Sequence, residues 1–261
     1  MEAEHPNRMT IRASSPFTLA ESFMTIPLRY AIVIPTYNHG AQIRGVIEKC
    51  LKFKLPVVVV DDGSTDSTPD ILACFSGTTV IRHGKNEGKG ASLLSGFAEV
   101  LPIADWAVTI DADGQHDPEE ILSLMRAVPV NERPIVIGKR EKMGDKNVPW
   151  TSRWGRRFGN FWVWASCGRW LSDSQSGFRV YPLPEILHLG TRSKRFQFEV
   201  VVLVRAVWSG IPIIETPVHA FYGPPEVRVS HFRPWLDFWR NTKVFARLIA
   251  IRVLVPSKRR R

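Results

Sequence analysis

The feature that most constrains the fold is a run of four consecutive valines that ends in two aspartates, at residues 57–62. Such an apolar β-branched run is typical of a strand buried on both faces, as in a parallel sheet covered by helices. Further strands are predicted at residues 30–34, 79–82, 106–110 and 134–138, and helices at 41–53, 67–75, 90–101 and 118–128. Strands that alternate with helices predict an α/β fold with a mostly parallel sheet.

The chain length fits one large domain with extensions at its ends. Of 261 residues, 44% are hydrophobic and 23% are charged, which excludes wholesale disorder. We expect a flexible N-terminal extension at 1–28, within which Met24 could be the true start, a single domain at 29–230, and a basic amphipathic C-terminal helix and tail at 231–261. The three cysteines are too few and too scattered for a disulfide framework or a zinc cluster, so a reducing compartment is expected.

The chain is strongly basic, with a net charge of +10, and this indicates an anionic partner. Basic residues and tryptophans concentrate in residues 133–170, and residues 228–261 repeat the basic bias along a helical stripe of apolar positions. One interpretation is a core-facing helix with a solvated basic side. The other is an interfacial helix whose aromatic residues lie among lipid headgroups. Two such segments favour an anionic membrane surface, although no segment has the 18 or more apolar residues needed to span a membrane.

Acidic residues follow two of the predicted strands. Asp61 and Asp62 follow one, and Asp111 and Asp113 follow another. Each pair alone could be a simple turn, but together they concentrate negative charge at one edge of the sheet, which favours a bound cation. Asp111, Asp113 and Gln115 alternate along the chain and can converge as oxygen ligands for Mg²⁺ or Mn²⁺. The spacing excludes an EF-hand calcium loop.

The ordered motifs of the chain resemble those of a known enzyme family. These are IVIPTYN (32–38), VVVVDDGSTD (57–66), NEGKGASLLSGF (86–97), IDADGQHDPE (110–119), DSQSGFRVY (173–181) and RFQFEVVVLVRA (195–206). In this order they resemble the family 2 glycosyltransferases, most closely the dolichyl-phosphate mannose and polyprenyl-phosphate hexose synthase branch. The resemblance spans about residues 30–230. It implies a GT-A fold, which is Rossmann-like with a mostly parallel sheet, and inverting transfer from a nucleotide-sugar.

The resemblance also implies roles for individual residues. Pro35, Tyr37 and Asp61 would hold the base and ribose, Asp62 and Lys89 would line the nucleotide site, Asp111, Asp113 and Gln115 would hold the metal and diphosphate, and Asp173 would face the sugar and acceptor. Phe198 and Glu199 match the helix below the active site. The chain departs from the family pattern at His39, where many of these synthases have Glu. It also carries EVRVSHFRP where these synthases often have a GESKL-like stretch. We choose Arg228 as the counterpart of the family's phosphate-binding arginine.

The nature of the acceptor decides which residues are catalytic. A lipid phosphate is already ionised at neutral pH and needs positioning and charge screening, for which Arg140, Arg153, Arg156 and Arg157 are candidates because a guanidinium binds phosphate at two points. A hydroxyl acceptor, on another lipid or a polyene, needs a general base, and Asp173 would then be the candidate. We therefore expect Asp113, Asp173 and Arg140 to be catalytic. Alternatively, each single arginine lies on a basic face of the protein that is exposed to solvent.

Three other classes of function compete with this prediction. A basic chain with aromatic residues could bind nucleic acid, but no recognised nucleic-acid module is present, and we expect no such partner. A sugar nucleotidyltransferase would need a Gly-rich cationic loop after the first strand, and PTYNHG has no cation. A catalytically inactive membrane adaptor is disfavoured by the intact acidic motifs. The sequence does not distinguish a UDP-hexose from a GDP-hexose donor. It predicts a peripheral protein on the cytoplasmic face of the inner membrane, or one held there by a membrane-protein partner.

Overall fold

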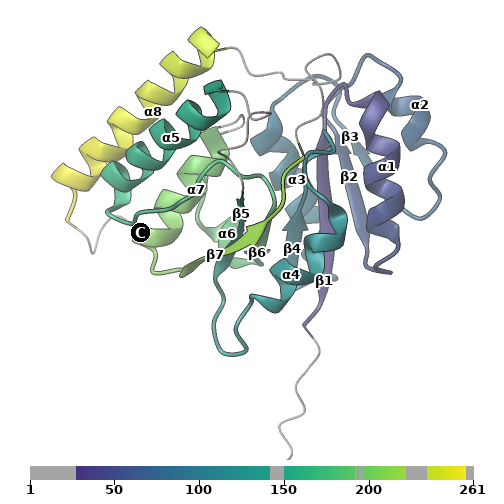
Figure 1. The fold of residues 1–261 in the computed structure, drawn as a ribbon, viewed down its shortest axis with the longest axis horizontal. Coiled ribbons are helices and arrows are strands. Elements are labelled where there is room, and N and C mark those ends of the chain that lie inside the picture. Colours follow the sequence, from purple (N-terminus) through teal and green to yellow (C-terminus); the bar gives the residue numbers. More distant parts are fainter. Residues whose placement is uncertain are drawn as a thin grey trace, which may run out of the picture.

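The computed structural model describes residues 28–141, 150–191, 193, 195, 197–221 and 234–256. The expected N-terminal extension at 1–28 therefore lies almost entirely outside the described residues, as does Arg228. Within these residues the strands are β1 (Tyr30–Thr36), β2 (Val57–Asp61), β3 (Thr79–Arg82), β4 (Trp106–Thr109), β5 (Ile135–Arg140), β6 (Arg179–Pro182) and β7 (Ile213–Val218). They form one sheet in the order β3-β2-β1-β4-β6-β5-β7 (Figure 1).

The sheet is mostly parallel, as the sequence predicts. Strand β6 is the exception, because it runs antiparallel to both β4 and β5. The strands β6 and β7 are not among those predicted from apolar runs. Arg179, Tyr181 and Pro182 in β6, and Glu215 and Thr216 in β7, give these strands a mixed composition. Their place in the sheet comes from pairing with distant strands, which a local pattern does not show.

Helices cover both faces of the sheet, as Figure 1 shows. The helices are α1 (Gly40–Leu51), α2 (Thr68–Leu72), α3 (Lys89–Val100), α4 (Ile121–Arg126), α5 (Trp150–Cys167), α6 (Glu185–His188), α7 (Gln197–Trp208) and α8 (Pro234–Leu254), with the 3-10 helix η1 (Pro118–Glu120) before α4. Apolar residues of α1, α2 and α4 pack on one face of the sheet, and those of α3, α6 and α7 pack on the other. Alternate residues of each buried strand enter the two cores, which explains the unbroken valine run in β2.

Helices α5 and α8 pack against each other and against α7. Phe245 and Leu248 of α8 are buried in the core, and Trp162 of α5 stacks on Phe245 with 5.7 Å between ring centroids. Arg252, near the end of α8, donates to the carbonyl oxygens of Trp164 and Ala165 in α5. Two positions of the apolar stripe in the C-terminal helix, Phe245 and Leu248, therefore face the core. Among the described residues, no helix combines the length and the apolar character required to cross a bilayer.

Candidate active site

The loops that follow β1 and β2 interlock and form one unit at the carboxyl edge of the sheet. The backbone N–H of Asn38 donates to Ser64 Oγ at 2.9 Å, and Asn38 Oδ1 accepts from the N–H of Thr65 at 2.8 Å. In the same two loops, the N–H of Gly40, at the start of α1, donates to Asp66 Oδ2 at 3.0 Å. Pro35 is buried within β1 and Tyr37 follows it half-buried, so both predicted nucleotide-site residues lie beside Asp61 at this edge.

Asp61 and Asp62 have different surroundings although they are neighbours. Both oxygens of Asp62 are occupied within the protein: Oδ1 lies 2.8 Å from His83 Nδ1 and accepts from the N–H of Glu87, and Oδ2 accepts from the N–H of Gly88 at 2.7 Å. Asp62 therefore holds in place the Gly-rich turn that leads into α3. Gly88 has a φ of +103°, a conformation that favours glycine.

That turn delivers Lys89 into a buried ionic cluster. Lys89 Nζ lies 2.6 Å from Asp111 Oδ1 and 2.7 Å from Glu199 Oε1, so the amine joins α3, the loop after β4, and α7. Burial alone would lower the pKa of Lys89, but the two carboxylates outweigh it and raise the pKa. Burial likewise works to raise the pKa of Asp111, and the charge of Lys89 outweighs it and lowers the pKa. Both groups are therefore ionised at neutral pH.

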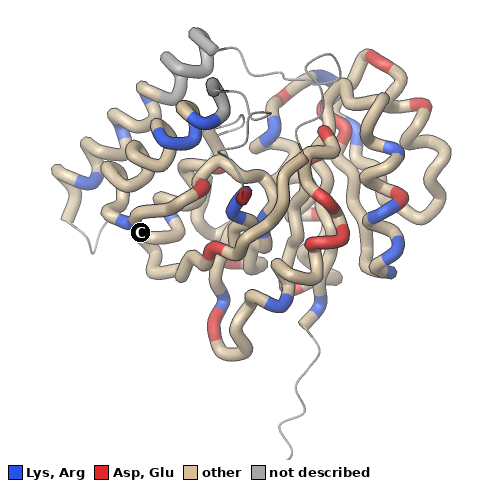
Figure 2. The backbone as a smooth tube through the Cα atoms, viewed as in Figure 1, with Lys and Arg blue, Asp and Glu red and all other residues tan. Residues whose placement is uncertain are grey.

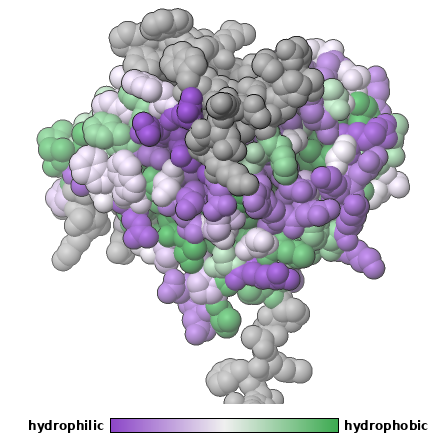
Figure 3. Space-filling model, viewed as in Figure 1, coloured by the Kyte–Doolittle hydropathy of each residue, from purple (hydrophilic) through white to green (hydrophobic). Residues whose placement is uncertain are grey.

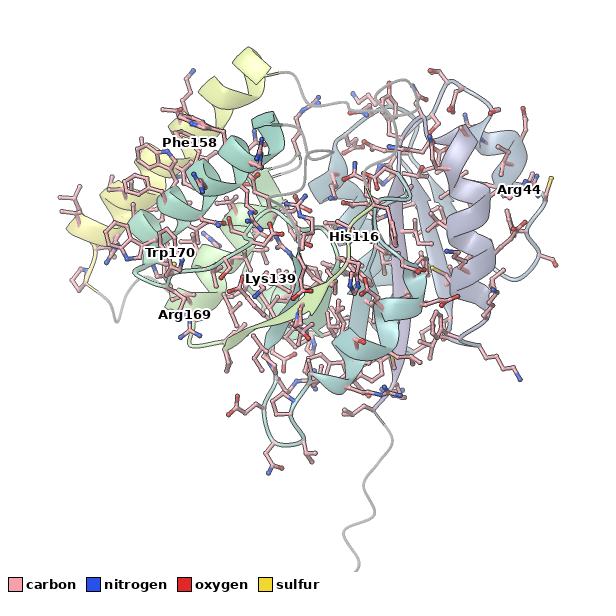
Figure 4. All side chains as sticks on the ribbon, in the orientation of Figure 1. Arg44, His116, Lys139, Phe158, Arg169 and Trp170 are labelled. Carbon is pink, nitrogen blue, oxygen red and sulfur yellow. The ribbon has the colours of Figure 1, made fainter. Side chains whose placement is uncertain are left out.

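Asp113 is the carboxylate whose charge is least compensated. Burial and then the negative charge of Asp111 raise the pKa of Asp113 to about 6. Its Oδ1 accepts from the N–H of Gln115 at 3.0 Å. Next to it, burial lowers the pKa of His116 to about 4, so this imidazole is neutral and brings no compensating charge. His116 lies at the centre of the molecule in Figure 4, with its ring 5.1 Å from that of Phe178.

The donor chemistry here fits a hard divalent cation. In the part of the chain that is described, no three His, Cys, Asp or Glu side chains stand close enough to hold a metal by themselves. Two carboxylates and the Gln115 amide, completed by substrate phosphates and water, match the way proteins bind Mg²⁺ and Mn²⁺. The raised pKa of Asp113 gives an independent sign of the fit, because a cation would relieve the repulsion between Asp111 and Asp113.

Asp173 and Arg140 form a two-point ion pair on the other side of the site. Arg140 Nε and Nη2 donate to the two oxygens of Asp173, each at 2.8 Å, and the Arg140 N–H donates to Oδ2 at 3.1 Å. Asp173 is fully buried. Burial alone would raise its pKa, but the hydrogen bonds and charge of Arg140 hold the pKa below the usual range. Asp173 is therefore a firmly ionised group at neutral pH.

Three residues outside the sequence-based prediction hold the Asp173 loop in place. Asn160 of α5 donates to the carbonyl oxygen of Ser172 at 2.7 Å and accepts from Ser174, and Glu215 of β7 accepts from the N–H groups of Ser172 and Asp173. Arg179 is fully buried and donates to the carbonyl oxygens of Ser174, Ser176 and Glu199. Only the GFR motif gave a signal for Arg179. Asn160 and Glu215 act across the fold, and no local pattern marks them.

The predicted phosphate-binding arginines do not all lie together. Arg156 of α5 is half-buried, and its Nη1 donates to the carbonyl oxygen of Arg140 at 3.3 Å, so these two lie next to each other. Its positive charge also acts on Asp173. Arg153 and Arg157, on the same helix, are exposed. The geometry thus brings together Arg140, Arg156 and Asp173, and the positive charge of Arg140 also acts on Asp113.

Comparison with known proteins agrees with this arrangement. Residues 31–184, more than half of the chain, match the glycosyl transferase family 2 domain. The chain belongs to glycosyl transferase family 2. This confirms the resemblance read from the ordered motifs, and the chain is a glycosyltransferase.

This glycosyltransferase is similar to proteins of several organisms. It is 28% identical over 213 residues to the UDP-N-acetylglucosamine–dolichyl-phosphate N-acetylglucosaminyltransferase of Methanococcus voltae, covering 73% of this chain and 85% of that protein. It is 31% identical over 207 residues to the undecaprenyl-phosphate mannosyltransferase of Micrococcus luteus, covering 73% and 83%.

A solved structure confirms the fold. The glucosyl-3-phosphoglycerate synthase of Mycobacterium tuberculosis, in complex with Mg²⁺ and uridine diphosphate, matches with a TM-score of 0.64 at 19% identity, over 88% of this chain and 81% of that one. At this identity the likeness concerns the fold alone. The predicted GT-A architecture is thereby confirmed.

Proposed function

We propose that this glycosyltransferase moves a hexose, with inversion, from a nucleoside diphosphate sugar to a polyprenyl phosphate at an anionic membrane surface. The observation that carries the proposal is the state of Asp173, whose two oxygens are both taken by Arg140. A general base for a hydroxyl acceptor works best with a pKa near the working pH, and Asp173 has the opposite shift. An ionised phosphate acceptor needs no such base.

The printed activities of the relatives support the same acceptor class. The Methanococcus voltae protein is named for transfer to dolichyl phosphate and the Micrococcus luteus protein for transfer to undecaprenyl phosphate. Both acceptors are phosphates on a polyprenyl chain. Arg140 and Arg156 are the residues here that suit such a phosphate, because they place two positive charges next to each other, with the Nε and Nη2 donors of Arg140 engaged by Asp173. Arg153 and Arg157 would screen charge further along α5.

The donor side of the mechanism rests on Asp111, Asp113 and Gln115. These residues would hold Mg²⁺ or Mn²⁺, the ions found with uridine diphosphate in solved structures of the same fold. The ion would stabilise the negative charge that grows on the departing diphosphate. Lys89 keeps Asp111 ionised and in place, and Tyr37 and Pro35 flank the nucleotide end. Arg140 and Arg156 hold the acceptor phosphate for attack.

A transfer assay tests this proposal directly. Radiolabelled UDP-hexoses and GDP-hexoses are incubated with the enzyme and membrane extract, with and without Mn²⁺, and label is counted in the organic phase. We expect label that depends on the cation and is recovered as a sugar on polyprenyl phosphate. Asp173→Asn should weaken transfer to polyprenyl phosphate yet leave it measurable. Complete loss with this variant, in protein that still unfolds cooperatively, would instead indicate a catalytic base and a hydroxyl acceptor.

The α5–α8 side of the molecule supports the membrane part of the proposal. Trp154, Phe161, Trp164 and Trp170 are each between 43% and 63% exposed, although aromatic side chains of this size are normally covered. Val253 and Leu254, at the end of α8, are exposed as well. Figure 3 shows hydrophobic surface at the left edge of the view, where the C-terminal end of α8 lies in Figure 1, and Figure 4 places Phe158, Arg169 and Trp170 on the same side.

Basic residues predominate on this side. Figure 2 shows Lys and Arg on the coloured parts of α5 and α8, and the sequence of α8 also contains one acid, Asp237. Exposed aromatic residues interleaved with arginine match the headgroup layer of an anionic membrane. We expect binding to vesicles that contain anionic lipid to weaken with added salt and with loss of the last five residues, SKRRR. Equal binding to neutral and anionic vesicles would contradict an electrostatic contribution. The cytoplasmic inner face and a membrane-protein partner remain predictions.

A further inference from the structure

The residues that follow β7 run alongside the loop that carries the predicted metal ligands. The N–H of Phe221 donates to the carbonyl oxygen of Gln115 at 2.7 Å, and Ala220 pairs with His116 in an isolated antiparallel bridge. Both contacts lie just beyond β7, at the carboxyl edge of the sheet. Residues 218–221 therefore support the backbone of Gln115 directly.

The same segment is also fixed to the acceptor side of the site. Val218 pairs with Arg140 in the parallel register of β5 and β7, and its carbonyl oxygen accepts from the N–H of Glu141 at 2.9 Å. Arg140 is held in turn by both oxygens of Asp173. Residues 218–221 thus join the arginine proposed for the acceptor phosphate to the loop proposed for the metal, and their position sets the spacing between the two.

One carboxylate fastens this segment at the first residue after β7. The backbone N–H of His219 donates to both oxygens of Glu120, each at 3.0 Å, and His219 Nδ1 lies 2.8 Å from Glu120 Oε1. An ionised carboxylate can only accept, so Nδ1 carries the hydrogen in this contact. Two N–H groups of one residue that converge on one carboxylate fix both its backbone and its side chain, unlike an ion pair between two mobile surface groups.

Glu120 itself stands on a rigid base. It is the last residue of η1 and lies between Pro118 and Ile121, which are both buried. Asp117, the residue before η1, accepts from the N–H of Glu119 and forms an ion pair with Lys49 of α1 at 3.2 Å. The carboxylate is therefore fixed relative to the core, and the segment after β7 is the part that it holds in place.

The contacts close a ring between the metal loop and the residues after β7. At one end Phe221 donates to Gln115, and at the other end His219 donates to Glu120. The N–H of Gln115 donates in turn to Asp113 Oδ1 at 3.0 Å, which extends the support to a second predicted metal ligand. Removal of a group that holds a metal ligand in place typically costs about 10–100-fold in metal affinity or activity.

We infer that Glu120 and His219 are positioning residues, whose contact fixes Gln115, and with it the metal loop, at its distance from Arg140. This inference rests on the proposed function, since it concerns how a proposed metal ligand is held. It also goes beyond it, because neither Glu120 nor His219 belongs to the ordered motifs or to the predicted site residues.

Isothermal titration calorimetry of the full chain tests the inference, with UDP and GDP titrated with and without Mn²⁺. The nucleotide that binds more tightly is then used for the variants. We expect Glu120→Ala to weaken the Mn²⁺-dependent binding by about 10–100-fold. His219→Phe keeps an aromatic ring but loses the Nδ1 donor, and should weaken it by about 10-fold. His219→Asn places an amide donor near the position of Nδ1 and should recover most of the lost affinity.

Matched controls remove the same groups elsewhere. Glu119→Ala removes a carboxylate from an exposed position of η1, directly before Glu120, and His188→Phe replaces an exposed imidazole in α6. We expect both controls to bind the nucleotide as the wild type does, because neither side chain supports the segment after β7.

Amide hydrogen exchange of the protein without metal gives a readout that does not depend on bound nucleotide. The Phe221 amide is protected by its hydrogen bond to Gln115. We expect Glu120→Ala to lower this protection by about 10-fold, as for the loss of one charged hydrogen-bond partner, and Glu119→Ala to leave it unchanged. Unchanged protection in Glu120→Ala would show that this carboxylate does not hold the segment, and the inference would be wrong.

Transfer kinetics separate positioning from a loss of folded protein. We expect Glu120→Ala to lower kcat/KM for the nucleotide-sugar and to leave KM for polyprenyl phosphate unchanged, because Arg140 is held independently by Asp173. A purely structural role of Glu120 would instead lower the free energy of unfolding in urea and leave the nucleotide affinity of the folded protein unchanged, and this result would contradict the inference.

The outcomes distinguish this inference from the proposed function. Wild-type affinity in Glu120→Ala, or equal affinities in His219→Phe and His219→Asn, would overturn the positioning role and leave the proposed transfer in place. Failure of Mn²⁺ to assist the binding of either nucleotide to the wild-type chain would overturn the proposed function, and the inference with it. If Glu120→Ala does not fold, the His219 variants carry the test, because the His219 side chain is 57% exposed.

Discussion

Replacing Gly177 by alanine tests whether the Lys89–Asp111 pair sets the geometry of the site. A Cβ atom at position 177 would stand 2.4 Å from Asp111 Oδ2 and 2.6 Å from Lys89 Nζ. Ordinary contact begins near 3.4 Å, so the pair must retreat by about 1 Å. A retreat of this size moves a predicted metal ligand, and a 1 Å misplacement costs catalysis on the order of 100-fold. Overpacking of this kind also destabilises a fold by about 1–3 kcal/mol.

The assay is kcat/KM for sugar transfer with Mn²⁺ titrated, together with the free energy of unfolding from urea denaturation. We expect Gly177→Ala to lower kcat/KM about 100-fold and to raise the Mn²⁺ concentration needed for half-maximal activity. Gly45→Ala in α1 is the matched control, because a Cβ there meets nothing within 4 Å. It should keep full activity and gain about 0.5–1 kcal/mol of stability as a helical glycine replaced by alanine. Wild-type activity and Mn²⁺ dependence in Gly177→Ala would refute the reasoning.

Three further predictions concern other parts of the molecule. Asn160→Ala leaves Ser172 and Ser174 without their partner in α5 and should destabilise the fold by about 1–3 kcal/mol in urea denaturation, whereas the exposed Asn131→Ala should have no effect. The pKa of Asp173 is lowered in the folded state, so its contribution to stability is complete above the unfolded pKa of about 4 and is lost as pH falls through the folded pKa. In urea denaturation across this pH range, the free energy of unfolding should fall less steeply with acid in Asp173→Asn than in the wild type. An equally steep fall in the variant would argue against the ion pair. Trp154→Ala with Trp170→Ala should reduce sedimentation with anionic vesicles, and the exposed Val130→Ala, away from α5, should not.

The sequence predicts the first half of the fold well because that half is built from local signals. The valine run of β2, the apolar strands β1 and β4, and the helices α1 and α3 are all expected within a few residues of their bounds. The strands of the second half are not marked by local sequence signals. Strand β6 fits antiparallel between β4 and β5, and its residues, Arg179 among them, carry no strong strand pattern. Tertiary pairing, rather than propensity, sets these strands.

The site was predictable in its residue types but not in its pairings. Motif order identified Lys89, Asp111 and Glu199 separately, and only the folded chain brings the lysine between the two carboxylates. Asp62 was expected to line the nucleotide site, and its surroundings show both oxygens bound to His83, Glu87 and Gly88. These contacts join residues that are 21 to 110 positions apart in the sequence, so no local pattern contains them.

The acidic edge of the sheet was expected to need a cation because four carboxylates meet there, and the pairings show where that need is greatest. Both oxygens of Asp62 are hydrogen-bonded, to backbone N–H groups and to His83, and Asp111 forms an ion pair with Lys89. Asp61 Oδ2 accepts no hydrogen bond within the described residues and lies 3.4 Å from Arg82 Nε. Burial and the charge of Asp111 both act against the ionised form of Asp113 and raise its pKa. The protein's own groups thus compensate the other three carboxylates in whole or in part, and Asp113 is the carboxylate that most needs a divalent ion. We therefore expect substitution of Asp113 to lower catalysis the most, and the stability of the fold the least, among these four residues.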